Sequence, residues 1–141
     1  QIDGRMMAQA APLRILIIDD DIHVQKSLAF VFRMMGHEIF AADSAAQGVR
    51  QFVESRPQLV FVDMVMPGGL GIDAVREIRA LDAVVHIVAM SGSDEGGQHN
   101  LLALARAAGA NRSLGKPFDF DAVERLLAEV ATAVAARRRA G

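Results

Sequence analysis

Short apolar runs, each ending in a polar residue, constrain the fold of this chain most strongly. Residues 15–18, 59–62 and 88–90 are uninterrupted apolar stretches, and each is followed directly by Asp or Ser. An apolar run of this length is typical of a strand that is buried on both faces, as in a parallel sheet. The pattern therefore predicts a parallel sheet with polar side chains beyond the carboxyl ends of its strands.

Segments with helical periodicity separate the apolar runs. Apolar residues recur at helical spacing between Asp21 and Gly36, between Ser44 and Pro57, and in the ranges 72–81, 98–108 and 119 to about 137. Asp21 and Ser44 suit helix N-caps, and Gly36 suits a helix stop. The strands are expected at 14–18, 37–41, 59–62, 84–90 and, more weakly, 111–114, with a turn-rich loop at 67–71. Five βα repeats predict one α/β domain with a parallel five-stranded sheet.

The composition narrows the class of protein. The 141 residues are 52% hydrophobic, contain no cysteine and carry a net charge of −2. Disulfides and thiolate metal sites are thereby excluded, and the charge gives no reason to expect nucleic acid or an anionic membrane as partner. No apolar stretch approaches the ~20 residues of a membrane span. We expect a cytoplasmic protein.

The two ends of the chain differ in character from the rest. Residues 1–5 (Gln-Ile-Asp-Gly-Arg) look like the remnant of an expression tag, and residues 6–12 form an N-terminal extension. The domain is expected at 13–136. Residues 137–141 form a basic C-terminal tail, and Arg137–Arg139 suit the negative pole of a helix end.

Three acidic residues are expected to meet at one edge of the sheet. Asp19 and Asp20 follow the first strand, and Asp63 follows the third. Gathered carboxylates repel one another unless a cation joins them. An all-oxygen set without Cys or His suits Mg²⁺ or Mn²⁺ better than zinc. The alternative is that Asp19–Asp21 only cap the next helix, and for Asp21 capping is the favoured role.

A carboxylate at such a place can attack phosphorus. Asp63 comes directly after a buried strand, which fixes its position, and an aspartyl phosphate could form on it. The charge on the phosphoryl oxygens must be met by cations and donors. Lys116 can supply a charge and Ser91 a hydroxyl. Pro117 favours an extended conformation at Lys116. Taken alone, Ser91 would be interpreted as an ordinary serine in a turn.

Together these motifs resemble the receiver domain of two-component response regulators. The resemblance covers nearly all of residues 13–136 and rests on sequences that match the family's motifs: Ile17-Ile18-Asp19-Asp20-Asp21, Phe61-Val62-Asp63-Met64-Val65-Met66-Pro67-Gly68, Gly71, Met90-Ser91-Gly92, Gly109-Ala110 and Lys116-Pro117-Phe118. It implies a single flavodoxin-like (βα)5 domain with helices on both faces and strand order 2-1-3-4-5.

The resemblance also implies roles for the site residues. Asp63 would accept a phosphoryl group from a histidine kinase or phosphotransfer protein, with Ser91 and Lys116 contacting it. Asp19, Asp20, Asp63 and the backbone carbonyl of Val65 would hold Mg²⁺, for which Mn²⁺ can substitute. The surface of the fourth helix, fifth strand and fifth helix would then be read by a downstream protein, or form a homodimer. Such a receiver is no enzyme in the usual sense, since it catalyses only its own phosphorylation and dephosphorylation.

Two positions depart from the family pattern or modulate it. An aromatic switch residue often stands three positions before the lysine, and here that position is Ser113. We therefore expect the glycine-rich stretch 92–97 to transmit more of the signal. Val65 cannot hydrogen-bond an attacking water through its side chain, which predicts slow self-dephosphorylation.

Two other functions compete with this interpretation. A Mg²⁺-dependent phosphohydrolase also forms an aspartyl phosphate, but it commonly carries a second Asp two residues on, where this chain has Val65. A receiver-like interaction module that is never phosphorylated usually lacks one of the site residues. Asp20, Asp63, Ser91 and Lys116 are all present here.

Overall fold

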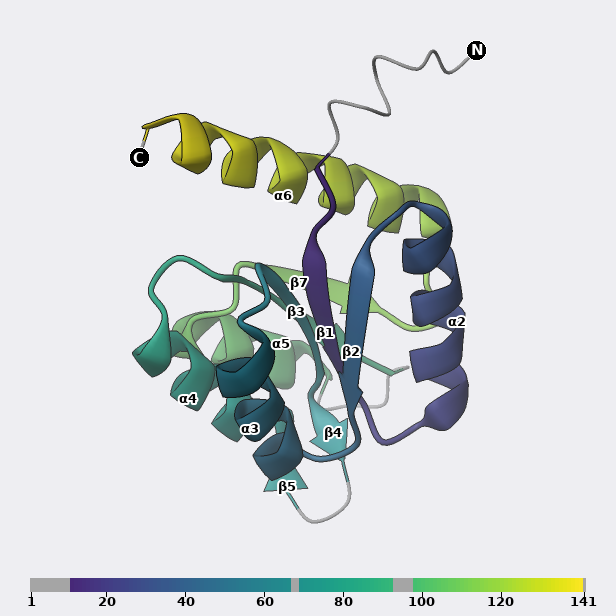
Figure 1. The fold of residues 1–141 in the computed structure, drawn as a ribbon. Helices are drawn as coiled ribbons and strands as arrows, with labels where there is room; N and C mark the ends of the chain where they lie inside the picture. The colour runs from purple at the N-terminus through teal and green to yellow at the C-terminus, as the bar shows by residue number, and fades with distance from the viewer. Residues whose placement is uncertain (1–10, 67–68, 93–97, 141) are drawn as a thin grey trace.

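Strands and helices alternate in the computed structural model, which describes residues 11–66, 69–92 and 98–140. Figure 1 shows the elements in this order: β1 (Arg14–Ile18), α2 (Ile22–Met34), β2 (Glu38–Ala42), α3 (Ala45–Ser55), β3 (Leu59–Asp63), β4 (Val65–Met66), β5 (Gly69–Leu70), α4 (Gly71–Leu81), β6 (His86–Ser91), α5 (Gln98–Ala108), β7 (Arg112–Gly115) and α6 (Phe120–Ala140).

Five parallel strands form the central sheet in the order β2-β1-β3-β6-β7. Because β6 and β7 are the fourth and fifth strands of this sheet, the order 2-1-3-4-5 and the α/β fold class are confirmed. Ile18 pairs with Val62, Asp63 with Met90, and Ser91 with Gly115. The carboxyl ends of β1, β3, β6 and β7 therefore lie side by side.

The sheet separates two hydrophobic layers. Side chains alternate along each central strand, so Leu16 and Ile18 face α3, α4 and α5, whereas Ile15 and Ile17 face α2 and α6. In the second layer the rings of Phe32 and Phe61 stack with centroids 5.3 Å apart. The central strands are thus buried on both faces and hold the residues at their ends in fixed positions.

The helix ends follow the expected signals, with one addition. The carboxylate of Asp21 accepts the N–H of His23, and the hydroxyl of Ser44 accepts that of Gln47. Gly36, with φ of 93°, follows the C-cap of α2. Arg56 ends α3 in the left-handed region, with φ of 52°, which sequence patterns do not reveal because arginine has no preference for that conformation.

Some boundaries differ from the sequence-based expectations. The strand expected at 84–90 begins only at His86, because Asp82 Oδ1 accepts the N–H groups of Val84 and Val85 in a turn. Part of the expected loop 67–71 is a strand, since Gly69–Leu70 pairs antiparallel with Val65–Met66. Val53 and Leu81 fall in the segments whose apolar residues recur at helical spacing, yet they are 49% and 58% exposed.

The last helix extends past the point where the domain was expected to end. Residues 137–140 of the expected tail continue α6 as helix. No helix in the described part of the chain is both long and apolar enough to cross a membrane.

Candidate functional site

Three carboxylates meet at the carboxyl ends of β1 and β3. Asp19 is fully buried, Asp63 is 5% exposed, and Asp20 is exposed. One carboxylate oxygen from each lies within 4.8 Å of the others. The structure thus brings together the three acidic residues that the sequence placed at one edge of the sheet.

Hydrogen bonds fix Asp19 from several sides. Its N–H donates to the carbonyl of Ala42 (3.0 Å), and its Oδ1 accepts the N–H of Asp21 (2.9 Å). The side-chain amide of Gln25 donates to the carbonyls of both Asp19 and Ala42. Gln25 therefore supports the site, although nothing in the sequence indicated it, because its role depends on the pairing of β1 with β2.

Lys116, which directly follows β7, contacts two of these three carboxylates. Its Nζ lies 2.7 Å from Asp19 Oδ2 and 3.6 Å from Asp63 Oδ2, and its backbone N–H donates to the carbonyl of Ser91 (2.8 Å). Burial disfavours the ammonium ion, but the hydrogen bond to Asp19 and the two nearby carboxylates outweigh burial and raise the pKa of Lys116. The side chain is therefore a fixed positive charge.

Asp63 has an unusual affinity for protons. Burial and the neighbouring charge of Asp19 raise its pKa from 3.8 to about 6, although Lys116 and a hydrogen bond from the backbone of Val65 act in the opposite direction. The three carboxylates thus resist full ionisation. A hard divalent cation would relieve that repulsion, and its preference for oxygen ligands fits this donor set.

The backbone around Asp63 leaves no room for an extra side chain at Gly71. A Cβ on Gly71 would lie 2.0 Å from the Asp63 carbonyl oxygen. The Gly71 N–H donates to the carbonyl of Met64 (3.1 Å), and the Val65 N–H donates to Asp63 Oδ1 (3.3 Å). The segment that contains the β4–β5 hairpin therefore begins and ends close to the backbone of Asp63, and the side chain of Val65 is 55% exposed.

The hydroxyl expected at the site lies at the end of β6. Ser91 is 3% exposed, and its Oγ donates to the carbonyl of Gly92 (3.3 Å). Ser113 lies exposed on β7, so this position presents no buried ring. Most of the stretch 92–97, to which we assigned signal transmission, lies outside the described residues.

Comparison with known proteins decides the family. The family model for the response regulator receiver domain matches residues 15–128. The chain belongs to this family. Receiver domains are signalling modules of two-component systems, in which they work with histidine kinases and downstream effectors, and they bind Mg²⁺ at an acidic pocket. The family indicated by the sequence motifs is thereby confirmed.

Relatives of this receiver differ in how much of their length it spans. It is 36% identical over 111 residues to the chemotaxis protein CheY of Bacillus subtilis, covering 78% of this chain and 90% of that protein. Sporulation initiation phosphotransferase F of the same organism is 29% identical over 110 residues, covering 78% and 86%. The structure of NtrX from Brucella abortus, with a TM-score of 0.81 and 23% identity, matches 92% of this chain but only 29% of its own length and shows the fold alone.

Proposed function

We propose that this receiver accepts a phosphoryl group on Asp63 and changes its surface in response. The observation that carries the proposal is the environment of Asp63, which is buried beside Asp19 and 3.6 Å from the Lys116 ammonium. A domain comprising residues 13–136, within which the family match falls, would carry out this function in the cytoplasm.

In the proposed reaction, an oxygen of the Asp63 carboxylate attacks the phosphorus of a phosphohistidine. The N–P bond of the donor breaks as the O–P bond forms, and the released imidazole takes up a proton. Asp19, Asp20, Asp63 and the Val65 carbonyl would hold Mg²⁺ or Mn²⁺, which supplies charge to the transferring phosphoryl oxygens. Lys116 adds a second positive charge and holds Asp19 in place.

The signal would begin at Ser91. Its present hydrogen bond to Gly92 is long, at 3.3 Å, so exchange of that partner for a phosphoryl oxygen costs little. A movement of Ser91 would displace the backbone that follows it, and with it the surface of α5, β7 and α6. A downstream protein, or a second copy of the chain, would bind there. A comparison of hydrogen exchange with and without a phosphoryl mimic tests this, and unchanged exchange across residues 92–104 would contradict it.

Phosphorylation by a small-molecule donor tests the proposed function. Incubation with acetyl phosphate and Mg²⁺ should add one phosphoryl group to the intact protein, and EDTA should prevent the addition. If no adduct forms even with Mg²⁺ present, the result would instead favour an interaction module that is not phosphorylated. Sustained turnover of p-nitrophenyl phosphate would favour a phosphohydrolase.

A further inference from the structure

A basic hollow lies at the amino ends of the strands. This is the edge of the sheet opposite the three carboxylates of Asp19, Asp20 and Asp63. Its volume is about 330 Å³, and its wall includes Gln58 and Val85, which directly precede β3 and β6. Three arginines also line it, namely Arg56, Arg137 and Arg138. The hollow is therefore separate from the proposed phosphorylation site.

The three arginines come from elements far apart in the sequence. Arg56 is the C-cap residue of α3 and has a left-handed backbone conformation. Its N–H donates to the carbonyl of Phe52. Arg137 and Arg138 lie near the end of α6. The ion pairs recorded within the described part of the chain involve Arg112 and Lys116, so none of the three has a carboxylate there within 4.0 Å.

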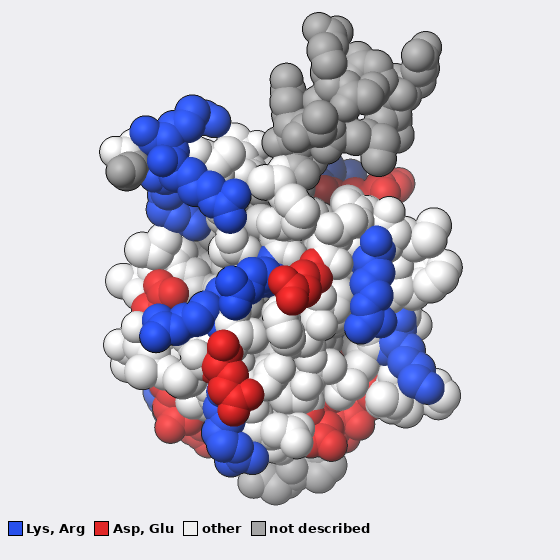
Figure 2. Space-filling view, in the orientation of Figure 1, with Lys and Arg blue, Asp and Glu red and all other residues white. Residues whose placement is uncertain are grey.

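The acidic residue in the wall is engaged in its own loop. Asp82 Oδ1 accepts the N–H groups of Val84 (2.7 Å) and Val85 (3.1 Å), which fixes the carboxylate in the turn before β6. The three arginines therefore share the hollow with one carboxylate, whose Oδ1 already accepts two hydrogen bonds. Figure 2 shows Lys and Arg gathered over the end of α6, with fewer acidic side chains nearby.

The positive field extends to a neighbouring residue. The pKa of His86 is lowered, first by burial and then by the charges of Arg137, Arg112 and Arg79. His86 adjoins the hollow through its N–H, which donates to the carbonyl of Gln58 (3.1 Å). The wall also has apolar residues, among them Val134 and a half-exposed Val84.

We propose that this hollow binds a small, multiply charged phosphate compound. Guanidinium groups bind phosphate oxygens through paired hydrogen bonds, and the apolar wall suits a ligand body of modest size. Neutralisation of the dipoles of α3 and α6 would account for each arginine separately, but it does not explain why all three line one hollow. The ligand would report on a second signal, independent of the phosphoryl group on Asp63.

Calorimetric titration of the whole chain with inorganic pyrophosphate and with a nucleoside diphosphate tests the proposal. At least one of these should bind saturably with a stoichiometry of one. If only the nucleotide binds, the ligand body contributes; if both bind equally, the phosphates suffice. Citrate serves as a carboxylate control of similar charge, and equal binding of citrate would overturn the assignment to phosphate.

Matched variants locate the binding. Arg137→Gln, Arg138→Gln and Arg56→Gln should each weaken binding at least about tenfold, since each removes charged hydrogen bonds. Arg139→Gln removes the same charge from the same helix but does not line the hollow, and it should change the affinity less than about threefold. Arg137→Lys keeps the charge but loses the paired geometry, and should fall between them.

Two results would overturn the proposal. One is the absence of saturable binding of both phosphates at millimolar concentration. The other is an equal loss in Arg139→Gln, which would indicate a non-specific basic surface. Thermal unfolding of every variant shows that it is folded, and acetyl phosphate labelling should remain at the level of the parent because the hollow lies at the other edge of the sheet.

Discussion

Asp63 stands between charges that act on its pKa in opposite directions. Burial and Asp19 raise the pKa, and Lys116 lowers it, with a net value of about 6. The same ammonium is hydrogen-bonded to Asp19 at 2.7 Å, so these three side chains act as one electrostatic unit. Substitution of either neighbour should therefore shift the pKa of Asp63, and the sign of the removed charge sets the direction of the shift.

We predict opposite shifts from two single substitutions in metal-free protein. Asp19→Asn removes a negative neighbour and should lower the pKa of Asp63, whereas Lys116→Gln removes a positive neighbour and should raise it above about 6. Carboxyl carbon shifts followed by NMR across pH measure both values. Shifts in the same direction for the two variants would contradict this account of the site.

The carboxylate of Asp63 should also lower the stability of the metal-free fold. With a pKa near 6 against an ordinary 3.8, the folded state holds a proton that the unfolded state has released between about pH 4 and 6. Stability therefore falls as pH rises through this window.

Asp63→Asn removes that effect and should stabilise the protein at pH 7. The full shift of about two pKa units at about 1.4 kcal/mol each sets an upper limit, so we expect a gain of about 1–3 kcal/mol. Urea unfolding in EDTA measures the gain, and unfolding of the parent at pH 4 provides the comparison. A less stable Asp63→Asn protein at pH 7 would show that this carboxylate is not under strain.

Val65 should influence how long the phosphoryl group survives. Its exposed apolar side chain beside Asp63 cannot orient a water molecule. Replacement with Asn would supply a hydrogen-bonding group, and we expect the decay of the phosphorylated protein to become several-fold faster, with Val65→Ile as the apolar control. Loss of the phosphoryl group can be followed by intact mass, and equal decay in all three proteins would contradict the prediction.

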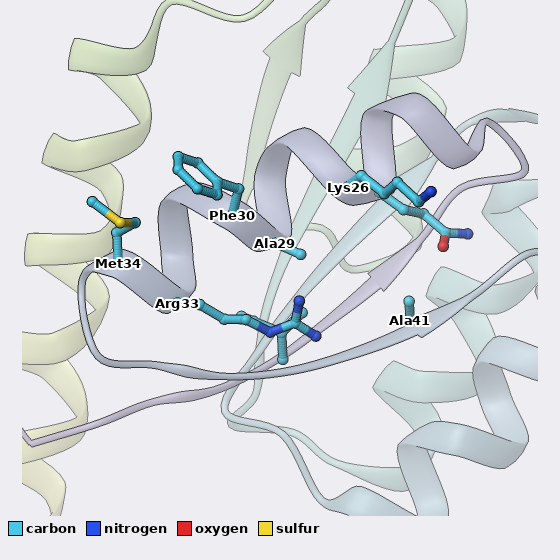
Figure 3. Close-up of a pocket in the computed structure, with 8 residues that line it drawn as sticks. Lys26, Ala29, Phe30, Arg33, Met34 and Ala41 are labelled. Atoms are coloured by element: carbon cyan, nitrogen blue, oxygen red, sulfur yellow. The ribbon is translucent and has the colours of Figure 1, made fainter.

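Among the elements, α2 shows how the sheet selects one face of a helix. Phe32 is fully buried and stacks on Phe61, whereas Phe30, two residues earlier, is 65% exposed. Phe30 and Met34 on α2 also line a hollow of about 540 Å³ between this helix and β2. Figure 3 shows the two side chains on the helix. The two phenylalanines therefore form a matched pair for measuring what the core contributes.

We predict that Phe32→Ala lowers the free energy of unfolding by about 3–5 kcal/mol, because it leaves a cavity against the sheet. Phe30→Ala should change it by no more than about 0.5 kcal/mol, as at other exposed positions. Chemical denaturation of the parent and the two variants measures these free energies of unfolding. A loss above about 2 kcal/mol in Phe30→Ala would mean that its ring is buried in solution.

Elements with a local signal were predictable from the sequence, and those formed by tertiary contact were not. The strand expected at 14–18 has the same bounds as β1, and Asp21 and Ser44 cap their helices as expected. The β4–β5 hairpin was not predicted, because strands of two residues show no periodicity in the sequence. The meeting of the three carboxylates could be predicted because each of them follows a strand. The supporting roles of Gln25 and Gly71 could not, because they depend on the close approach of other segments of the chain.

The whole molecule places two charged regions at opposite edges of one sheet. Carboxylates gather at the carboxyl ends of β1 and β3, and arginines line the hollow at the amino ends of β3 and β6. The long helix α6 begins four residues after Lys116 and carries Arg137 and Arg138 near its end, so α6, like β3, connects the two regions.

The acceptor residue is the central claim, and the mass of the intact protein tests it most directly. After acetyl phosphate and Mg²⁺, the parent and Asp43→Asn, which alters an exposed aspartate outside the site, should each carry one phosphoryl group. Asp63→Asn should carry none. A phosphoryl adduct on Asp63→Asn equal to that on the parent would contradict the account.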